Sequence, residues 1–187
     1  RKFTPDLEQL IEVCVARRPM ISIAAAPRDI GQLVQNELGG QSSEALAADI
    51  AELSEMFACL FDLETVGLRL TVLRGSMCPR FHVDQIPCRL LITLSGGGTE
   101  WIANEDVDWK LFDDRTNLDA PLKEKKKVKQ FKAGEWSLLK GGTWQSQFNG
   151  VVHRSPNIYE DRLMLSLDPI FHEDQFKMNL RQNHQII

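Results

Sequence analysis

The spacing of apolar residues is helical in the first third of the chain and extended afterwards. A Thr-Pro-Asp cap at 4–6 precedes an apolar stripe over 7–15 with the helical period of about 3.6 residues, and Pro19 ends it. The same criteria predict two more helices, over 28–38 and over 43–61, and leave the apolar run 21–26 as either a strand or a buried connection.

From Glu64 onward the apolar period is two residues, which is typical of strands, and glycine and proline punctuate the segment. Many short strands after a helical lead-in predict an α+β fold in which a jelly roll has helices on one side. We expect a helical region over 1–63, packed on one sheet, and a β domain over 64–187. The expected strands are 68–74, 80–84, 88–94, 99–103, 136–140, 150–154 and 162–168.

The segment 104–132 separates two groups of expected strands and is strongly charged. Six acidic residues lie in 104–119, and six lysines lie in 123–132. Opposite charges in one segment can pair with each other, so we expect a surface excursion that folds on itself. We favour a solvated face over an electrostatic lid or a phosphate-binding patch, because charge runs are usually solvated.

The overall composition excludes several classes of protein without identifying one. With 43% hydrophobic and 26% charged residues, the chain is typical of a globular domain and not of a disordered segment. The net charge of −4 argues against a dedicated nucleic-acid or anionic-membrane binder. No apolar run approaches the roughly 20 residues of a membrane span, and four cysteines do not make a disulfide scaffold. We therefore expect a cytoplasmic protein.

The sharpest local feature is the sequence Phe81-His82-Val83-Asp84. In an extended segment His82 and Asp84 project from the same face, because side chains alternate with a period of two. An imidazole and a carboxylate on one face supply two ligands of a metal site. A third ligand would complete a facial triad, which leaves positions open for substrate and oxygen. Alone, His-x-Asp has little specificity.

Two later strands add a histidine and an arginine to this pattern. The apolar stretch 150–153 delivers His153 at its end. In the next expected strand Arg162, Met164 and Ser166 share one face, and leucines occupy the other. An arginine on the inward face of a core strand is costly unless it meets an anion, and a planar guanidinium binds a carboxylate through two parallel hydrogen bonds.

The order of His82-x-Asp84, a glycine-rich turn, His153 and Arg162 resembles that of the Fe(II)- and 2-oxoglutarate-dependent oxygenases. The resemblance covers about residues 64–170 and implies a cupin-like double-stranded β-helix. It also implies His82, Asp84 and His153 as iron ligands and Arg162 as the anchor of 2-oxoglutarate. The implied activity is that of a dioxygenase that hydroxylates or demethylates a bound substrate.

One position departs from that superfamily pattern. A helper hydroxyl often lies two residues after the arginine, where this chain has Met164, so we take Ser166, on the same face as Arg162, as a candidate second anchor. At a closer level, the chain resembles the bacterial family DUF1826, and this resemblance covers most of its length. The sequence segments that carry it are MCPRFHVDQIPCRLLITLSGGGTEWI, GVVHRSP and RLMLSLDP.

Two cysteines leave an alternative open. Cys78 precedes His82 and Cys88 follows Asp84, each with three residues between. Thiolates beside a histidine favour zinc over iron, so the alternative is a zinc-binding or non-catalytic cupin-like protein of bacterial metal homeostasis. A strand separates its residues by about 3.3 Å each, so both cysteines reach one ion only if the chain folds back. A metal-free binding module on the same fold is a third candidate.

Several further side chains are expected near or outside the site. Arginines near its mouth fit an anionic substrate, and equally fit salt bridges to the acidic part of 104–132. His172 and His184 follow the last expected strand, so we expect them on the surface or in a tail. Cupin-like sheets often pair, which makes a homodimer one expected state. The arginines at the mouth are Arg74, Arg80, Arg89 and Arg154.

Overall fold

The computed structural model describes residues 3–39, 43–144 and 149–171. Its internal contacts divide the chain into two compact units. Among the described residues, the first unit holds 3–20 with 70–166, and the second holds 21–69 with 167–171. Each unit therefore combines segments that are far apart in the sequence. Within the described ranges, no helix has both the length and the apolar character needed to cross a membrane.

This division differs from the expected boundary between residues 63 and 64. Helix α1 (Pro5–Arg17) belongs to the first unit, where it contacts strand β3 (Cys88–Ser95). Strands β2 (Thr65–Arg74) and β8 (Asp161–Ile170) each run from one unit into the other. Packing between distant segments, rather than the change of apolar period along the chain, decides which elements share a compact unit.

The three predicted helices are present. The Oγ1 of Thr4 accepts a hydrogen bond from the N–H of Leu7 at 3.4 Å and caps α1, which ends where Arg18 has a left-handed conformation with φ of 54°. The ambiguous apolar run forms a strand, because it pairs with β2. The remaining elements of this part are β1 (Met20–Ala25), α2 (Pro27–Leu38) and α3 (Glu44–Phe61).

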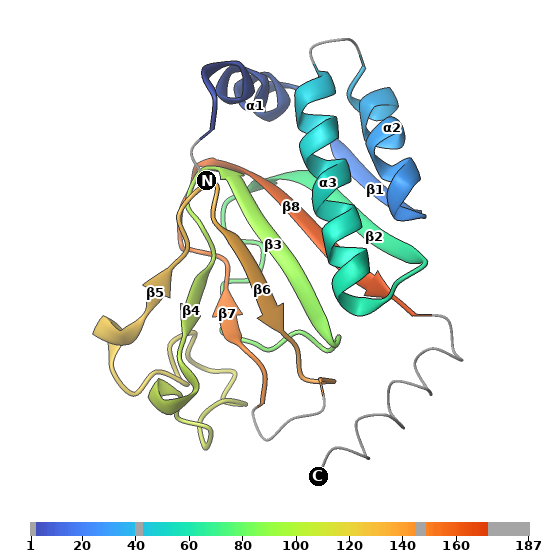
Figure 1. Ribbon diagram of the computed structural model, residues 1–187. Coiled ribbons are helices and arrows are strands. Elements are labelled where there is room, and N and C mark those ends of the chain that lie inside the picture. Colours follow the sequence, from blue (N-terminus) through green and yellow to red (C-terminus); the bar gives the residue numbers. More distant parts are fainter. Residues whose placement is uncertain (1–2, 40–42, 145–148, 172–187) are drawn as a thin grey trace. The chain divides into compact units, whose positions relative to one another are not determined.

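In the second unit α2 and α3 lie side by side (Figure 1). Gly31 of α2 permits this close approach, since a Cβ at that position would lie 2.8 Å from the Cβ of Ala51 in α3. Ile30, Val34 and Ile50 are fully buried between the packed elements. The strands that contribute to this unit follow the order β1-β2-β8.

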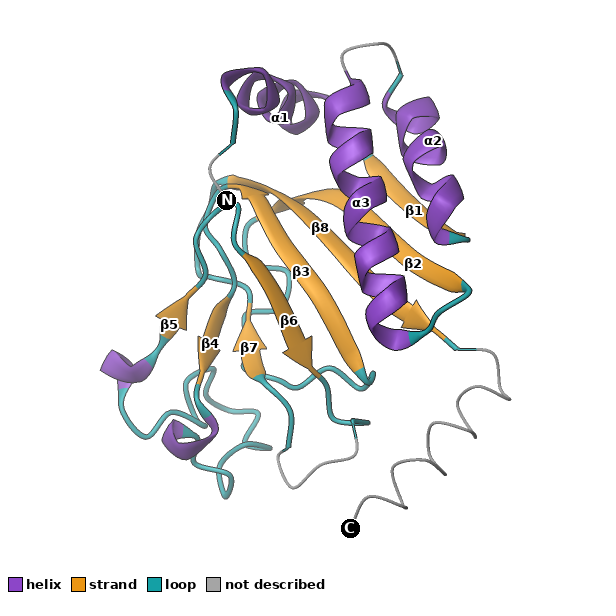
Figure 2. Ribbon diagram, in the orientation of Figure 1, coloured by secondary structure: helices purple, strands orange, loops and turns teal. Residues whose placement is uncertain are grey.

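The first unit contains strands of two sheets (Figure 2). One has the order β2-β8-β3-β6, and the other has the order β5-β4-β7. Strand β3 pairs antiparallel with β6, and β4 pairs antiparallel with both of its neighbours. Most of the expected strands are thereby confirmed. The strands not yet located are β4 (Glu100–Ile102), β5 (Lys129–Gln130), β6 (Trp136–Lys140) and β7 (Val152–Arg154).

The expected strand over 80–84 is wrong. Only His82 in this segment makes a bridge, and its partner is His153. The two residues exchange backbone hydrogen bonds of 3.0 Å in both directions. Pro79 and Pro87 bracket the segment, and proline lacks the N–H that a longer ladder needs. His82 is therefore aligned as in a strand, while Asp84 lies in irregular chain.

The charged segment 104–132 folds on itself, as the sequence predicts. Val107 and Leu122 form a bridge across it. The Nζ atoms of Lys125 and Lys127 lie 3.3 Å from carboxylate oxygens of Asp119 and Asp106, respectively. Most of the charged side chains of the excursion are exposed. Its apolar residues, among them Val107, pack against one face of the three-stranded sheet β5-β4-β7, which we call the small sheet. There they form an apolar cluster with Phe81, Ile102 and Val152.

Candidate metal centre

The small sheet brings two histidines together on one face. His153 on β7 lies opposite Trp101 on β4, and on its other edge His153 bridges to His82. Residues directly opposite each other in antiparallel pairs project from the same face. In agreement, the ring centroids of His82 and His153 are 4.5 Å apart.

Asp84 completes a cluster of three potential ligands. Its Oδ1 lies 3.6 Å from Nε2 of His82, and its Oδ2 lies 3.6 Å from Nε2 of His153. One ligand atom from each residue lies within 4.8 Å of the others. Two imidazoles and one carboxylate are the donor set of a facial triad, which suits Fe(II) and leaves positions open. The three residues that the sequence predicts as ligands are thus brought together.

Both histidines are oriented to bind through Nε2. The Nδ1 of His82 lies 2.9 Å from the carbonyl oxygen of Arg80, and the Nδ1 of His153 lies 3.0 Å from that of Val151. A carbonyl oxygen only accepts hydrogen bonds, so in each neutral imidazole Nδ1 carries the proton and donates it. Nε2 then presents its lone pair on the side of Asp84, as in metal sites that fix the tautomer through the other ring nitrogen.

The surroundings shift the pKa of each member of the cluster. The carboxylate of Asp84, whose Oδ1 lies 3.6 Å from Nε2, raises the pKa of His82, although burial opposes it. Burial lowers the pKa of His153. Burial alone would raise the pKa of Asp84, but the nearby His82 and the charge of Arg89 outweigh it, so this pKa lies below its ordinary value. Asp84 is therefore an anion and His153 a neutral imidazole at neutral pH, which are the forms that bind a metal.

Two glycines after β6 fix the backbone that carries Asp84. The N–H of Gly142 donates to the carbonyl oxygen of Asp84 at 2.8 Å, and the N–H of Gly141 donates to that of Pro87 at the same distance. At Gly141 a Cβ would overlap the carbonyl group of Ile86. Only glycine permits such a close approach of two backbones, so this pair of glycines positions a predicted ligand.

Arg89 of β3 holds the carboxylate of Asp84 directly. Its Nη1 lies 2.8 Å from Oδ2 of Asp84. From the sequence, Arg89 is expected only at the mouth of the site, together with Arg74. In the structure Arg74 instead lies 3.6 Å from a carboxylate oxygen of Asp161. The distinguishing signal in the sequence is a charged residue inside an otherwise apolar strand.

Arg162 is the largest fully buried side chain among the described residues, with an exposed fraction of 0%. Its Nη2 lies 3.5 Å from the Oγ1 of Thr99, while its Nε and Nη1 have no hydrogen-bond partner within that part of the chain. Burial lowers the pKa of this guanidinium. A buried cation without an anion is costly, so the position is suited to receive an anionic ligand.

Thr99 links Arg162 to the face that carries the histidines. The N–H of Phe131 donates to the carbonyl oxygen of Thr99 at 3.0 Å, which continues the pairing of β4 with β5 by one residue. Thr99 and Trp101 therefore share a face, about 7 Å apart along the strand, and Trp101 lies opposite His153. The sequence pattern alone does not identify Thr99, because its partner is 63 residues away.

The other candidate residues lie apart from the cluster. Ser166 is buried four residues after Arg162, about 13 Å along β8. Cys78 is exposed and Cys88 is buried. Neither cysteine belongs to the cluster of potential ligands found among the described residues. His172 and His184 lie outside those residues.

Arg154 stabilises the opposite face of the small sheet. Its Nε and Nη1 lie 2.7 Å from carboxylate oxygens of Glu100 and Asp119, and its guanidinium lies 4.1 Å from the ring centroid of Phe81. Arg154 follows His153 in the chain, and Phe81 precedes His82. The side chain of Arg154 therefore stabilises both segments that carry the histidines. For Arg154 the salt bridge to the acidic part of the excursion is confirmed.

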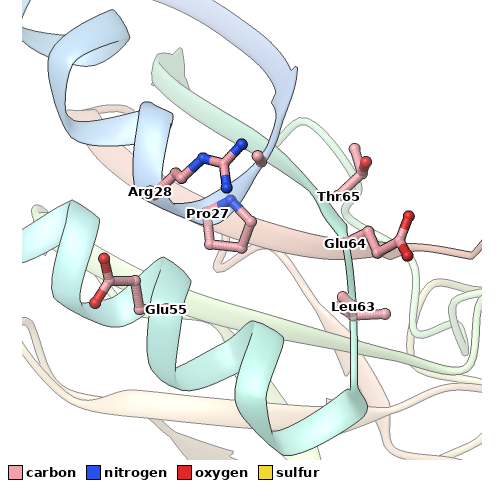
Figure 3. Close-up of a pocket in the computed structure, with 7 residues that line it drawn as sticks. Pro27, Arg28, Glu55, Leu63, Glu64 and Thr65 are labelled. Carbon is pink, nitrogen blue, oxygen red and sulfur yellow. The ribbon is translucent and has the colours of Figure 1, made fainter.

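The second unit has a cavity of about 580 Å³ next to the start of α2 (Figure 3). Pro27 and Arg28 come from α2, Glu55 from α3, and Glu64 from the chain that leads into β2. The remaining lining residues are Ala26, Leu63 and Thr65. The lining contains no histidine or cysteine, and none of the predicted site residues contributes to it.

Comparison with known proteins gives a family and a fold. The sequence profile of the family described as "Protein of unknown function (DUF1826)" matches residues 4–168. No curated protein matches the sequence. A solved structure of the dioxygenase for auxin oxidation 1 from Arabidopsis thaliana, in complex with 2-oxoglutarate, is 9% identical with a TM-score of 0.51. The match covers 82% of this chain and 63% of that protein, so the chain spans less than two thirds of the dioxygenase.

Two further solved structures are similar at lower TM-scores. The dioxygenase for auxin oxidation from rice is 11% identical, with 92% of this chain and 71% of that one covered, at a TM-score of 0.49. A prolyl-4-hydroxylase from Pseudomonas putida is 13% identical, with 91% and 89% covered, at 0.46. The Arabidopsis match supports the expected jelly-roll fold, and the antiparallel pairs and three helices agree with it.

Proposed function

We propose that this chain, which belongs to the DUF1826 family, is a dioxygenase-like protein that uses Fe(II) and 2-oxoglutarate on a double-stranded β-helix. In this proposal His82, Asp84 and His153 hold the metal, and Arg162 holds the far carboxylate of 2-oxoglutarate. The single observation that carries the proposal is the buried Arg162, whose Nε and Nη1 lack partners among the described residues, on the same side of the small sheet as the three ligands.

The donor set fits the metal. Two imidazole nitrogens and one carboxylate suit Fe(II) and do not fill its coordination shell. The backbone carbonyls of Arg80 and Val151 orient the rings, so that both Nε2 lone pairs point to one side. The donors also accommodate zinc, which the alternative of a non-catalytic cupin-like protein requires. That alternative draws its specific support from Cys78 and Cys88, which lie outside the cluster.

Arg162 and Thr99 fit a carboxylate ligand. The two unpartnered nitrogens of Arg162 can donate two parallel hydrogen bonds to one carboxylate. Thr99 accepts from Nη2 of Arg162, so its own hydroxyl proton is available for the same ligand. Thr99 thereby occupies the role of the helper hydroxyl that Met164 does not provide.

Fe(II) and 2-oxoglutarate held by these residues would supply oxidative chemistry, in which 2-oxoglutarate and O₂ would give succinate and CO₂, one oxygen atom of O₂ would enter succinate and the other would enter a C–H bond of the substrate. The chain's own contribution is to bind and orient. Arg162 and Thr99 fix one end of the co-substrate, and the inner face of the small sheet presents the ligands beside Trp101. Other residues determine which substrate is bound, because substrate specificity resides in loops rather than in the fold.

Succinate formation from 2-oxoglutarate tests this function without knowledge of the substrate. The purified protein, loaded with Fe(II) in air, is expected to release succinate slowly in an uncoupled reaction. The variants His153→Ala and Arg162→Met should both lose this release, the first with its metal and the second while it still binds metal. Stoichiometric zinc with no succinate in the unaltered protein would support the alternative and reject the dioxygenase.

A further inference from the structure

The two oxygens of the Asp84 carboxylate have different surroundings. Oδ2 accepts a hydrogen bond from Nη1 of Arg89 at 2.8 Å and lies 3.6 Å from Nε2 of His153. Oδ1 lies 3.6 Å from Nε2 of His82. The charge-assisted hydrogen bond therefore engages one specific oxygen of a potential metal ligand, and the other oxygen remains beside Nε2 of His82.

Arg89 projects from a strand into the interior of the first unit. On β3 its neighbours on the same face are Leu91 and Thr93, and both are buried. The side chain of Arg89 is itself largely buried, with an exposed fraction of 23%. A guanidinium at such a position is costly unless it meets an anion. Here the anion is a ligand of the candidate metal centre rather than a surface acid.

We propose, on the basis of the metal site proposed above, that Arg89 is a positioning residue that occupies Oδ2 of Asp84 and leaves Oδ1 as the single carboxylate ligand. A carboxylate that is free to turn can bind a metal through both oxygens. An oxygen that is hydrogen-bonded to a guanidinium is not available for a second bond to the metal. Arg89 thereby leaves one more coordination position of the metal for exchangeable ligands, which are water molecules when no other ligand is bound.

The same contact sets the affinity of the site. A positive charge next to the ligand repels a divalent cation, and the second oxygen contributes no bond. Arg89 therefore lowers metal affinity and preserves open positions. A residue with a merely structural role would have the opposite signature, because its removal would loosen the site and weaken metal binding.

Mn²⁺ provides a direct probe of this role, because bound Mn²⁺ accelerates the relaxation of water protons in proportion to its exchangeable waters. We would compare the unaltered protein with Arg89→Met, which removes charge and donor, and Arg89→Lys, which keeps both. Arg18→Met is the matched control, since Arg18 lies 2.7 Å from Asp161 in a similar pair of the same unit. Circular dichroism confirms that each variant is folded.

Arg89→Met is expected to bind Mn²⁺ about tenfold more tightly, because a positive charge that repels the cation is removed, and with about one fewer water. Arg89→Lys should restore most of the water count, and Arg18→Met should match the unaltered protein. An unchanged water count in folded Arg89→Met, or weaker Mn²⁺ binding, would overturn the inference. No bound Mn²⁺ in any of the proteins would overturn it together with the metal site. If the water count changes as expected but no succinate forms, only the proposed dioxygenase function fails.

Discussion

The guanidinium of Arg162 meets the hydroxyl of Thr99 at 3.5 Å in the buried interior of the first unit. The contact joins the start of β8 to the residue that precedes β4. It leaves Nε and Nη1 of Arg162 without partners among the described residues. Burial of a partly unpaired cation is unfavourable in free energy. An anion that binds at this position is its most direct explanation.

The first prediction concerns the cost of that unpaired cation. Arg162→Met should leave the free energy of unfolding of the ligand-free protein unchanged or raise it by about 1 kcal/mol, because an uncompensated buried charge is replaced by an apolar side chain. Urea denaturation of both proteins measures the difference.

Arg154→Met is the comparison for this prediction. Arg154 is paired with Glu100 and Asp119, so its loss removes the guanidinium from two partly buried acids, of which Asp119 keeps its contact with Lys125. We expect stability to fall by about 2 kcal/mol. If Arg162→Met were the more destabilising of the two, Arg162 would be a structural residue that is already satisfied in the folded chain.

A second prediction addresses the ligands. Asp84→Asn should weaken Mn²⁺ binding by at least about 100-fold, because the site loses its only negatively charged donor. Asp114→Asn is the matched control, since Asp114 is an acid of the excursion that bonds to Thr116 and lies outside the cluster. Isothermal titration of both variants checks this. Equal affinities would mean that Mn²⁺ binds to the acidic surface.

The third prediction is a pH dependence of the metal-free protein. The carboxylate of Asp84, 3.6 Å from Nε2 of His82, raises the pKa of this histidine above its ordinary value of 6.5. The stability that protonated His82 contributes is therefore full below pH 6.5 and is lost as the pH rises through the raised pKa. The pKa of His153 is lowered by burial, so its contribution is full above pH 6.5 and is lost as the pH falls.

Asp84→Asn separates these two effects. Without the carboxylate the pKa of His82 should fall towards 6.5, whereas the pKa of His153 should remain below that value because burial is its principal cause. Imidazole NMR signals followed across the pH range report both groups. A His82 signal with the same pKa in both proteins would contradict the electrostatic influence assigned to Asp84.

A fourth prediction tests the backbone support of Asp84. Gly141→Ala should lower the stability by about 3 kcal/mol and weaken metal binding, because the new Cβ would displace the carbonyl group of Ile86 in the turn after Asp84. Gly67→Ala introduces a Cβ that meets Ile170 at 3.4 Å, an ordinary van der Waals distance. The metal affinity of this variant should therefore be unchanged. Thermal unfolding and Mn²⁺ titration of both variants provide the measurement.

Local pattern was sufficient to predict the helices and most strands. Alternation paired His82 with Asp84, but the full set of three candidate ligands was implied only by the resemblance of the motif order to that of the Fe(II)- and 2-oxoglutarate-dependent oxygenases. The strand predicted over 80–84 failed because Pro79 and Pro87 restrict pairing to one bridge. The cluster forms nevertheless, since that one bridge is between His82 and His153.

What the sequence could not predict depends on contacts between distant segments. Thr99 meets Arg162 only because the residue before β4 and the start of β8, 63 positions apart in the sequence, come together in the fold, and no local period encodes that. The pairing of Arg89 with Asp84 depends in the same way on how the irregular chain after His82 returns to β3. The membership of α1 in the first unit likewise follows from its contact with β3.

The most direct test of the central claim is the visible absorption of the protein with Fe(II) and 2-oxoglutarate added under anaerobic conditions. If His82, Asp84 and His153 hold the metal and Arg162 anchors the co-substrate, a charge-transfer band should appear and saturate at one equivalent of each. The band should be absent in His153→Ala and should need much more 2-oxoglutarate in Arg162→Met. An unaltered protein that binds Fe(II) but gives no band at saturating 2-oxoglutarate would contradict the account.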